Sequence, residues 1–129
     1  MPRILVSLLF VLILASAAMA QDPVKVDATH YKVEFENAQV RVLRAKLGPG
    51  EKSIMHRHPN AVAIFLTDVN GKFNFPNGTS QDVSSKAGEA RWNTAVTHMP
   101  ENMGGQPFEV ILVELKSRPA KKAHHRRRH

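Results

Sequence analysis

The chain has 129 residues, a formal net charge of +7 at pH 7 and 43% hydrophobic residues. It contains no cysteine, which excludes disulfide bonds and thiol catalysis. Residues 21–115 carry 10 Lys and Arg against 11 Asp and Glu, whereas residues 116–129 carry 7 basic residues and no acidic one. The positive charge therefore belongs to one end of the chain and does not indicate a basic domain with an acidic partner.

Residues 1–20 predict a cleaved signal peptide. Arg3 gives a short positive region, Ile4–Ala15 is an apolar stretch, and Ala18-Met19-Ala20 has the small-x-small pattern that precedes cleavage. The alternative, a membrane anchor, is disfavoured because the apolar stretch is shorter than the roughly 20 residues of a spanning helix. We therefore expect a soluble periplasmic or secreted product, residues 21–129, that forms one domain and has no nucleic-acid role.

The exported part divides into a polar lead, residues 21–30, a β-patterned body, residues 31–116, and a basic tail, residues 117–129. In the body, short apolar or alternating runs lie between turn signals about every eight to twelve residues, as in an all-β sandwich or barrel. Strands are expected over residues 31–36, 39–47, 53–58, 61–67, 72–75, 82–85, 90–97 and 108–116. No window predicts a helix, because Gly or Pro interrupts each one.

Glycine, proline and asparagine mark the expected turns of the body. Gly48-Pro49-Gly50 and Pro76-Asn77-Gly78 each predict a tight turn, because glycine accepts a positive φ and proline fixes its own. Asn70-Gly71 is a strong signal for a two-residue hairpin turn. The body is therefore expected to be built of short antiparallel strands.

His56-Arg57-His58 is the first candidate metal motif. On a strand, alternate side chains face the same way, so both imidazoles lie on one face about 6.6 to 7 Å apart along the chain, and Arg57 faces the opposite, surface side. Imidazole nitrogen suits Zn, Cu, Fe and Ni. The two rings can converge on one ion, but a third ligand is needed.

The pattern around these histidines resembles that of the cupins. Gly50-Glu-Lys-Ser-Ile-Met-His56-Arg-His58 resembles the first cupin motif, a glycine, five residues and His-x-His, with Gly71 near the glycine that closes it. Gly88, Trp92 and His98-Met-Pro-Glu-Asn102 resemble the second motif, in which a histidine is followed by an asparagine. The resemblance covers about residues 40–116 and implies a single-domain jelly-roll β-barrel over the body.

In that family the motif histidines meet inside the barrel. The resemblance therefore implies that His56, His58 and His98 bind one divalent transition metal: Fe, Zn, Mn or Ni. Where cupins usually place a glutamate ligand, this chain has Val62 or Ala63. The site would be a three-histidine site with open positions, or a site that lost its metal together with the glutamate.

Four further residues are candidates to line a pocket beside the metal: Trp92, Thr94, Glu101 and Asn102. Trp92 and Thr94 share the strand parity of His98 if residues 90–98 form one regular strand. Core packing for Trp92 and a solvated loop position for Glu101 are the alternatives. No residue is identified as catalytic.

Three functions remain open. The first is a metal-dependent enzyme on a small molecule, such as an oxygenase, isomerase or lyase, with oxygenase-like chemistry preferred for a three-histidine set. The second is a module that binds a small molecule or a metal ion without catalysis, which the lack of an acid, base or nucleophile beside the histidines favours. The third is a structural protein that buries a sheet face in a homodimer.

The tail, residues 117–129, is expected to be disordered, because its like charges repel and it has nothing apolar to bury. Its basic residues could instead lie on an anionic surface, with binding that falls with salt. His124, His125 and His129 could also capture metal, but weakly on a flexible chain.

Overall fold

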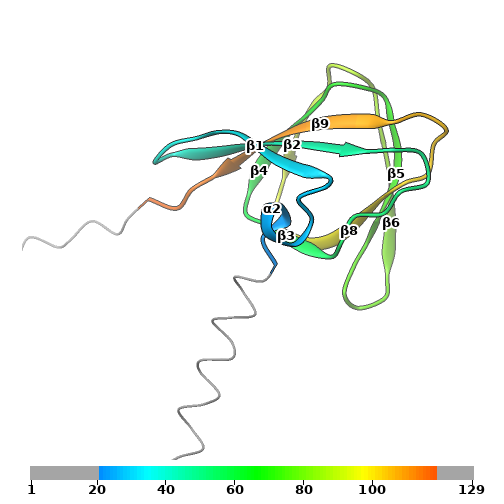
Figure 1. The fold of residues 1–129 in the computed structure, drawn as a ribbon, viewed down its shortest axis with the longest axis horizontal. Coiled ribbons are helices and arrows are strands. Elements are labelled where there is room, and N and C mark those ends of the chain that lie inside the picture. The colour runs from blue at the N-terminus through cyan, green and yellow to red at the C-terminus, as the bar shows by residue number, and fades with distance from the viewer. Residues whose placement is uncertain (1–20, 119–129) are drawn as a thin grey trace, which may run out of the picture.

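The computed structural model describes residues 21–118, which form two antiparallel β-sheets that face each other as a barrel (Figure 1). The prediction of an all-β fold is confirmed. The predicted signal peptide and residues 119–129 of the predicted tail lie outside the described residues. Within residues 21–118 there is no helix of the length and apolar character needed to cross a membrane.

One sheet has five strands in the order β1-β2-β9-β4-β7, and the other has four in the order β3-β8-β5-β6. The strands are β1 Tyr31–Glu36, β2 Val40–Leu47, β3 His56–His58, β4 Ala61–Phe65, β5 Val69–Asn74, β6 Ser80–Ser85, β7 Ala90–Asn93, β8 Val96–Asn102 and β9 Phe108–Leu115. The predicted strands over residues 31–36, 39–47 and 108–116 match β1, β2 and β9 to within one residue.

The core lies between the two sheets, because side chains alternate between the interior and the surface along the strands that enclose it. In β9, Phe108, Val110 and Leu112 are buried, and the residues between them are half-buried on the outer side. Leu43 and Leu47 of β2 are fully buried, and burial of such a side chain contributes about 1.5 to 3 kcal/mol.

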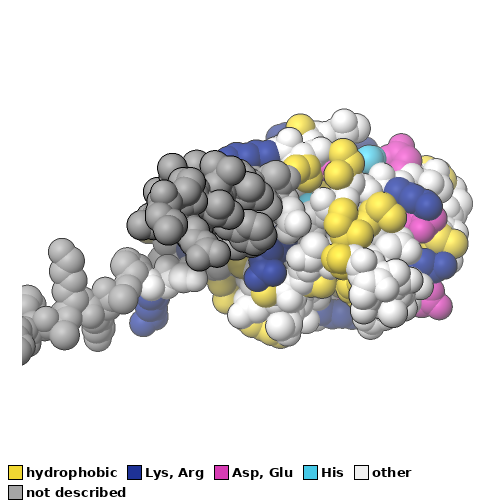
Figure 2. Space-filling view, turned by 90° about the horizontal axis from the view of Figure 1, so that it is seen from below, with side chains coloured by type: hydrophobic (Ala, Val, Ile, Leu, Met, Phe, Trp, Pro, Cys, Tyr) yellow, Lys and Arg dark blue, Asp and Glu magenta, His cyan; other side chains and the backbone are white. Residues whose placement is uncertain are grey.

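The surface in Figure 2 has hydrophobic side chains near the middle and alternating basic and acidic side chains along the right edge.

The predicted hairpin turn at Asn70-Gly71 is wrong. Both residues lie inside β5, where Gly71 pairs with Val83 of β6 and with Asn102 of β8. A Cβ on Gly71 would lie 3.0 Å from the carbonyl oxygen of Glu101, so glycine permits a close approach of two strands here. The hairpin turns instead at Pro76-Asn77-Gly78, where Gly78 has a φ of 84°.

The single strand predicted over residues 90–97 is also wrong. The chain leaves the five-stranded sheet after Asn93 and enters the four-stranded sheet at Val96. The side-chain amide of Asn60 accepts a hydrogen bond from the backbone N–H of Ala95 at 2.8 Å and supports this crossing. Strand parity therefore does not continue from β7 into β8.

The lead begins with one helical turn, α2 Pro23–Val26, which the sequence analysis did not predict. Asp22 caps it by accepting a hydrogen bond from the backbone N–H of Val24 at 2.9 Å, and Pro23 stands at its start, where no N–H is needed. The turn packs against β1 and β3. It therefore lies next to the strand that carries two of the predicted metal ligands.

Candidate metal centre

Strands β3 and β8 bring the three predicted ligands together. His56 and His58 are buried on the inner face of β3, and Arg57 between them is exposed, as the alternation of a strand predicts. β8 pairs antiparallel with β3 and places His98 directly opposite His56. Two strands from distant parts of the sequence therefore point three imidazoles into the same interior space.

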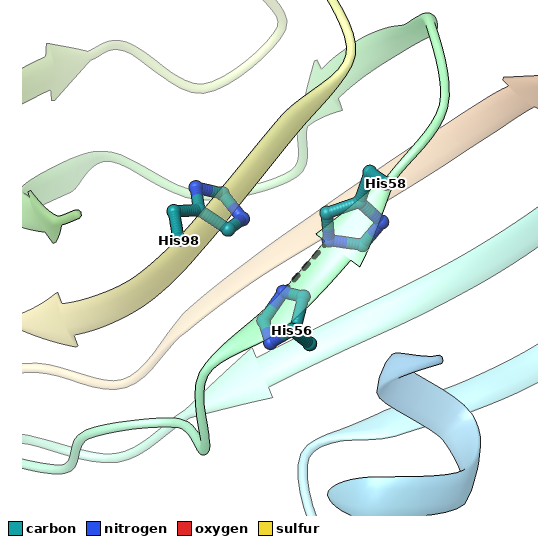
Figure 3. A group of neighbouring side chains, drawn as sticks. All are labelled: His56, His58 and His98. Atoms are coloured by element: carbon teal, nitrogen blue, oxygen red, sulfur yellow. Dashed lines mark hydrogen bonds between the residues drawn. The ribbon is translucent and has the colours of Figure 1, made fainter. Parts of the chain in front are cut away.

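The three rings form one compact cluster (Figure 3). Each histidine offers a ring nitrogen, and these nitrogens all lie within 4.8 Å of one another. The Nε2 atoms of His56 and His58 are 2.8 Å apart. Nitrogens that share a tetrahedral Zn²⁺ at about 2.0 to 2.1 Å are separated by about 3.4 Å, so small ring rotations suffice to hold an ion.

The hydrogen bonds on the far side of two rings fix which nitrogens face the centre of the cluster. The Nδ1 atom of His56 lies 2.7 Å from the carbonyl oxygen of Ile54, and the Nδ1 atom of His58 lies 2.6 Å from a carboxylate oxygen of Glu114. Both oxygens only accept, so each Nδ1 carries the proton and donates it. The two Nε2 atoms therefore face each other at hydrogen-bonding distance, 2.8 Å, and both can turn a lone pair toward a shared metal ion.

His98 gives the strongest sign that something belongs in this space. Its side chain is 4% exposed, and neither of its ring nitrogens has a hydrogen-bond partner among the described residues. A buried polar group without a partner is costly, typically by about 1 to 3 kcal/mol. A metal ion at the centre of the cluster would remove that cost, so the three residues fit such an ion.

The surroundings also keep His56 and His98 neutral. Burial, and to a lesser degree the neighbouring His58, lowers the pKa of His56 to about 4. Burial, followed by the neighbouring His58 and His56, lowers the pKa of His98 to about 2. Both imidazoles are therefore unprotonated near pH 7, and their lone pairs are available to a cation.

Glu114 is a buried carboxylate beside the cluster that the sequence analysis missed. Its side chain is 2% exposed, and besides accepting from His58 it accepts a hydrogen bond from Nε of Arg41 at 2.8 Å. The expectation that no acid or base stands beside the histidines is therefore wrong. Strand parity could have found Glu114, because it shares the inward face of β9 with Phe108, Val110 and Leu112.

A chain of polar contacts connects Glu114 to the surface. Arg41 donates from Nη1 to Asp22 at 2.7 Å, so it bridges the cap of α2 and the buried carboxylate. Partial burial alone would lower the pKa of Arg41, but its hydrogen bonds to Asp22 and Glu114 raise it. Arg41 therefore stays charged and balances the carboxylate that supports His58.

Aromatic rings enclose the cluster. The ring centre of Tyr31 lies 4.6 Å from that of His56, and the ring centre of Phe73 lies 4.4 Å from that of His98. Tyr31 is buried, and burial raises the pKa of its hydroxyl, so it remains protonated. The rings restrict the rotation of the histidines and exclude water from one side of the cluster.

A small cavity of about 60 Å³ lies inside the barrel next to His58 and His98. Three alanines, Ala45, Ala61 and Ala63, leave part of this space free because their side chains are short. The other lining residues are Tyr31, Phe65, Val69, Phe73, Val83, Asn93, Val96, Pro100, Phe108, Val110 and Leu112. Since no lining residue is an acid, a lysine or an arginine, the cavity suits a small uncharged molecule.

The four predicted pocket residues do not line this cavity. Trp92 and Thr94 are exposed, because the chain changes sheet between β7 and β8 and breaks the parity assumed for them. Glu101 faces outward and lies 3.8 Å from the ammonium group of Lys52. Asn102 is buried, but its amide donates to the carbonyl oxygens of Leu47 and Gln106 at 3.1 and 2.8 Å, so it holds a loop instead.

The position of the usual cupin glutamate is taken by residues that cannot bind metal. Ala63 is buried in the cavity wall, and Val62 faces outward. Glu114 lies on the neighbouring strand, β9, where it pairs with Ala61 of β4. The chain therefore offers three imidazole nitrogen ligands with a carboxylate behind one of them, which leaves coordination positions open for water or another small ligand.

No protein-family model and no curated protein matches the sequence. Among solved structures, the chain is similar to a cupin domain from Bordetella pertussis Tohama I, with 24% identity and a TM-score of 0.62 over 67% of this chain and 92% of that one. A protein with a double-stranded β-helix domain from Klebsiella pneumoniae has 20% identity and a TM-score of 0.52, over 68% of this chain and 84% of that one.

An RmlC-like cupin family protein from Methanocaldococcus jannaschii has 17% identity and a TM-score of 0.51, over 69% of this chain and 83% of that one. These three structures share the architecture of two facing antiparallel sheets, and identities at this level establish the fold alone. The resemblance found in the two histidine motifs agrees with them. The chain therefore has the double-stranded β-helix fold of the cupin superfamily.

Proposed function

We propose that this chain binds one divalent transition metal through His56, His58 and His98, and that the metal and the adjoining cavity together bind or convert a small molecule. The observation that carries the proposal is the buried His98, whose two ring nitrogens have no hydrogen-bond partner within residues 21–118. Iron, zinc and nickel are candidate metals because each of them suits imidazole ligands. Manganese is the fourth candidate and rests on the resemblance to the cupins alone.

Oxygenase-like chemistry is the preferred activity. A bound metal would supply Lewis acidity or redox chemistry at the open positions. The protein's own part would be to orient His58 through Glu114, to hold the rings between Tyr31 and Phe73, and to admit a small uncharged molecule to the cavity of about 60 Å³. An isomerase or lyase is the enzymatic alternative.

A binding module without catalysis is the second candidate. The cavity lining favours it, because among the lining residues only His58, His98 and Tyr31 can take part in proton transfer. The two histidines would be occupied by the metal, and the raised pKa of Tyr31 makes its hydroxyl a poor base. Such a protein would capture a metal ion or a small neutral ligand.

Metal analysis of the purified protein tests the proposal. The wild-type protein should contain about one transition metal ion per chain, and His56→Ala and His98→Ala should contain almost none. Arg57→Ala is the matched control, since it lies between the two histidines but points outward. Deletion from Ser117 removes the three tail histidines and should leave folding and metal content unchanged.

Equal metal content in the wild-type protein and both histidine variants would reject the proposed site. Loss of metal on deletion of the tail would instead assign the ion to His124, His125 and His129. With the site established, oxygen uptake across thiols, phenols and dicarbonyls would separate an oxygenase from a binding module.

Export to the periplasm or the medium is part of the same proposal and is supported by the signal-peptide pattern of residues 1–20. The absence of cysteine agrees with a protein that does not depend on the redox state of its compartment. N-terminal sequencing of the secreted protein should begin at Gln21. Retention of Met1 on a cell-associated product would reject export.

A further inference from the structure

The barrel cavity comes close to the surface at one place. Most of the residues that line it are buried, and the half-buried exceptions are Phe73, Val83, Asn93 and Val96. Val83 lies on β6 and Phe73 on the neighbouring β5, whereas Asn93 and Val96 stand on either side of the crossing from β7 to β8. β6 and β7 are edge strands of the two different sheets. The exposed part of the cavity wall therefore lies at the seam between these two edges, the β6/β7 seam.

Arg91 of β7 holds the β6/β7 seam together at one point. Its Nη2 donates a hydrogen bond to the backbone carbonyl oxygen of Ser84 in β6 at 2.6 Å. The same guanidinium lies 5.6 Å from the ring centre of Phe65, which lines the cavity. Within residues 21–118, no other hydrogen bond joins β6 to β7. Nothing of this kind therefore holds the edges together beside Val83 and Asn93.

Asn93 faces the inside of the barrel at this seam. It pairs directly with Ala61, which is buried and lines the cavity. Residues that pair directly across two strands share a face of the sheet, so the side chain of Asn93 is on the inner side as well. Among the residues that the structure describes, the Asn93 side-chain amide has no hydrogen-bond partner. An amide that can both donate and accept therefore stands at the edge of the cavity.

The polar groups of the cavity lie at different depths. Asn93 is the only amide in the lining, and the other residues with a polar side chain are Tyr31, His58 and His98. The two histidines are 5% and 4% exposed and belong to the metal cluster, whereas Asn93 is half-buried. A molecule that passes the β6/β7 seam therefore meets the Asn93 amide before it meets the imidazoles.

The size and charge of the cavity limit what can enter. Its volume is about 60 Å³, and one water-sized group needs about 10–15 Å³, so the space holds about four to six non-hydrogen atoms. No acid, lysine or arginine lines it, and burial of an unpaired charge is costly. These limits favour a compact, uncharged molecule that carries at most one or two polar groups.

We propose that the β6/β7 seam is the entrance to the metal cavity, and that Asn93 recognises a carbonyl or hydroxyl oxygen of a small uncharged substrate there. This inference names the substrate class of the proposed function and rests on that function for the metal alone. The amide donates from Nδ2 to the oxygen, and the apolar part of the molecule lies against the short alanine side chains. A molecule without the oxygen leaves the amide unpaired, which is a strong basis for discrimination.

Acetone and isobutene test the recognition, because they have nearly the same shape and only acetone carries an oxygen. Both are titrated into the purified chain, as isolated and after removal of metal by chelator, and followed by the NMR signals of Val83 and of the Asn93 side-chain amide. Asn93→Leu should weaken acetone binding about 2- to 12-fold, the loss of one hydrogen bond, and leave isobutene binding unchanged. Thr94→Leu is the control, since Thr94 is exposed and lies outside the cavity lining.

A bulky side chain at Val83 tests the entrance. Val83→Phe should narrow the β6/β7 seam and abolish the shifts caused by both probes. Asp82→Phe is the matched control, because Asp82 precedes Val83 on β6 but is exposed and faces the opposite side of the strand. Asn93 is the last residue of an edge strand, so Asn93→Ala repeats the recognition test if Asn93→Leu fails to fold.

Three outcomes would overturn the proposal. Either probe pair fails to bind the wild-type chain, or Asn93→Leu and Asn93→Ala bind acetone as tightly as the wild type, or Val83→Phe binds both probes as the control does. Failure of the proposed metal function has a different signature. The chain as isolated then holds no transition metal, while acetone and isobutene still bind with the predicted dependence on Asn93 and Val83.

Discussion

In the metal-free protein, burial of the His98 imidazole costs free energy that burial of His56 and His58 does not. His56 and His58 each donate a proton from Nδ1 to an acceptor, at 2.7 and 2.6 Å, whereas both nitrogens of His98 are buried without a partner in the described part of the chain. A residue that is unfavourable without its ligand is a sign of function at that position. The cost should be measurable.

The substitution His98→Leu should stabilise the metal-free protein while it abolishes metal binding. Removal of the unpaired imidazole, with a side chain of similar volume in its place, should raise the free energy of unfolding in the presence of chelator by about 1 to 2 kcal/mol. His56→Leu, which also loses the hydrogen bond to the Ile54 carbonyl, should show no such gain. Denaturant titrations of the two variants in the presence of chelator measure these changes in unfolding free energy. A loss of stability in His98→Leu would show that the imidazole of His98 has a hydrogen-bond partner in the wild-type protein.

Glu114 should set the metal affinity without touching the metal. Its hydrogen bond to Nδ1 of His58 holds the ring so that Nε2 faces the cluster, and the loss of such a partner typically lowers affinity about 10- to 100-fold. We expect Glu114→Ala to weaken metal binding by that factor and Glu114→Gln to weaken it less, because an amide oxygen can still accept the bond.

Competition with a chromophoric chelator measures this affinity. Glu109→Ala is the control, since Glu109 lies on the same strand but faces outward. If Glu114→Ala binds metal as tightly as the control, the carboxylate has a purely structural role in pairing Arg41.

At the scale of elements, the lead is tied to the barrel by His30. Its Nδ1 lies 2.9 Å from Asp27 and its Nε2 lies 2.6 Å from Glu51, so one imidazole links the end of the α2 segment to the loop before β3. Asp27 in turn accepts from the backbone N–H of Ile54 at 3.0 Å, two residues before His56. Burial alone would lower the pKa of His30, but its bonds to Asp27 and Glu51 raise it.

The contribution of His30 to stability should therefore depend on pH. Because the pKa of His30 in the folded state lies above its unfolded value of 6.5, the stabilisation is fully present below pH 6.5 and is lost as the pH rises through the folded pKa. Glu51 is half exposed, so the effect should be small, a few tenths to about 1 kcal/mol. The difference in unfolding free energy between the wild-type protein and His30→Gln should shrink from about pH 6 to about pH 9.

A difference that stays constant over this pH range would show that His30 acts only through packing. Thr29→Ala, at the exposed neighbouring position, serves as the control for local effects on the lead. The comparison of variants removes the contribution of the other titrating groups, which is common to both proteins.

The sequence predicted the individual strands better than their breaks. β1, β2 and β9 follow from alternation alone, because each has one face in the core. The break between β7 and β8 did not follow from the sequence pattern, since Thr94 and Ala95 carry no turn signal. The hydrogen bond that supports the crossing is made with Asn60, which is distant in the sequence. The wrong parity then placed Trp92 in the pocket, when it lies on the outer face of the other sheet.

At the scale of the whole molecule, local motifs located the histidines, but the register between distant strands determined the rest of the site. His56 and His98 meet because β3 pairs with β8, and Glu114 reaches His58 from β9, 56 residues further along the chain. A carboxylate on an inward position of an apolar strand was visible in the sequence. The contact of Glu114 with His58 was not visible in the sequence, because contacts between strands depend on the order of strands in the two sheets.

X-ray absorption spectroscopy of the metal-loaded protein reports the atoms bound to the ion and therefore tests the three-histidine centre itself. We expect three imidazole nitrogens at about 2.0 to 2.2 Å from one ion per chain, with oxygen ligands in the remaining coordination positions. The same spectrum should persist after deletion from Ser117, whereas His98→Ala should hold almost no metal and give no such spectrum. A spectrum without imidazole scattering, or one unchanged in His98→Ala, would contradict the three-histidine centre.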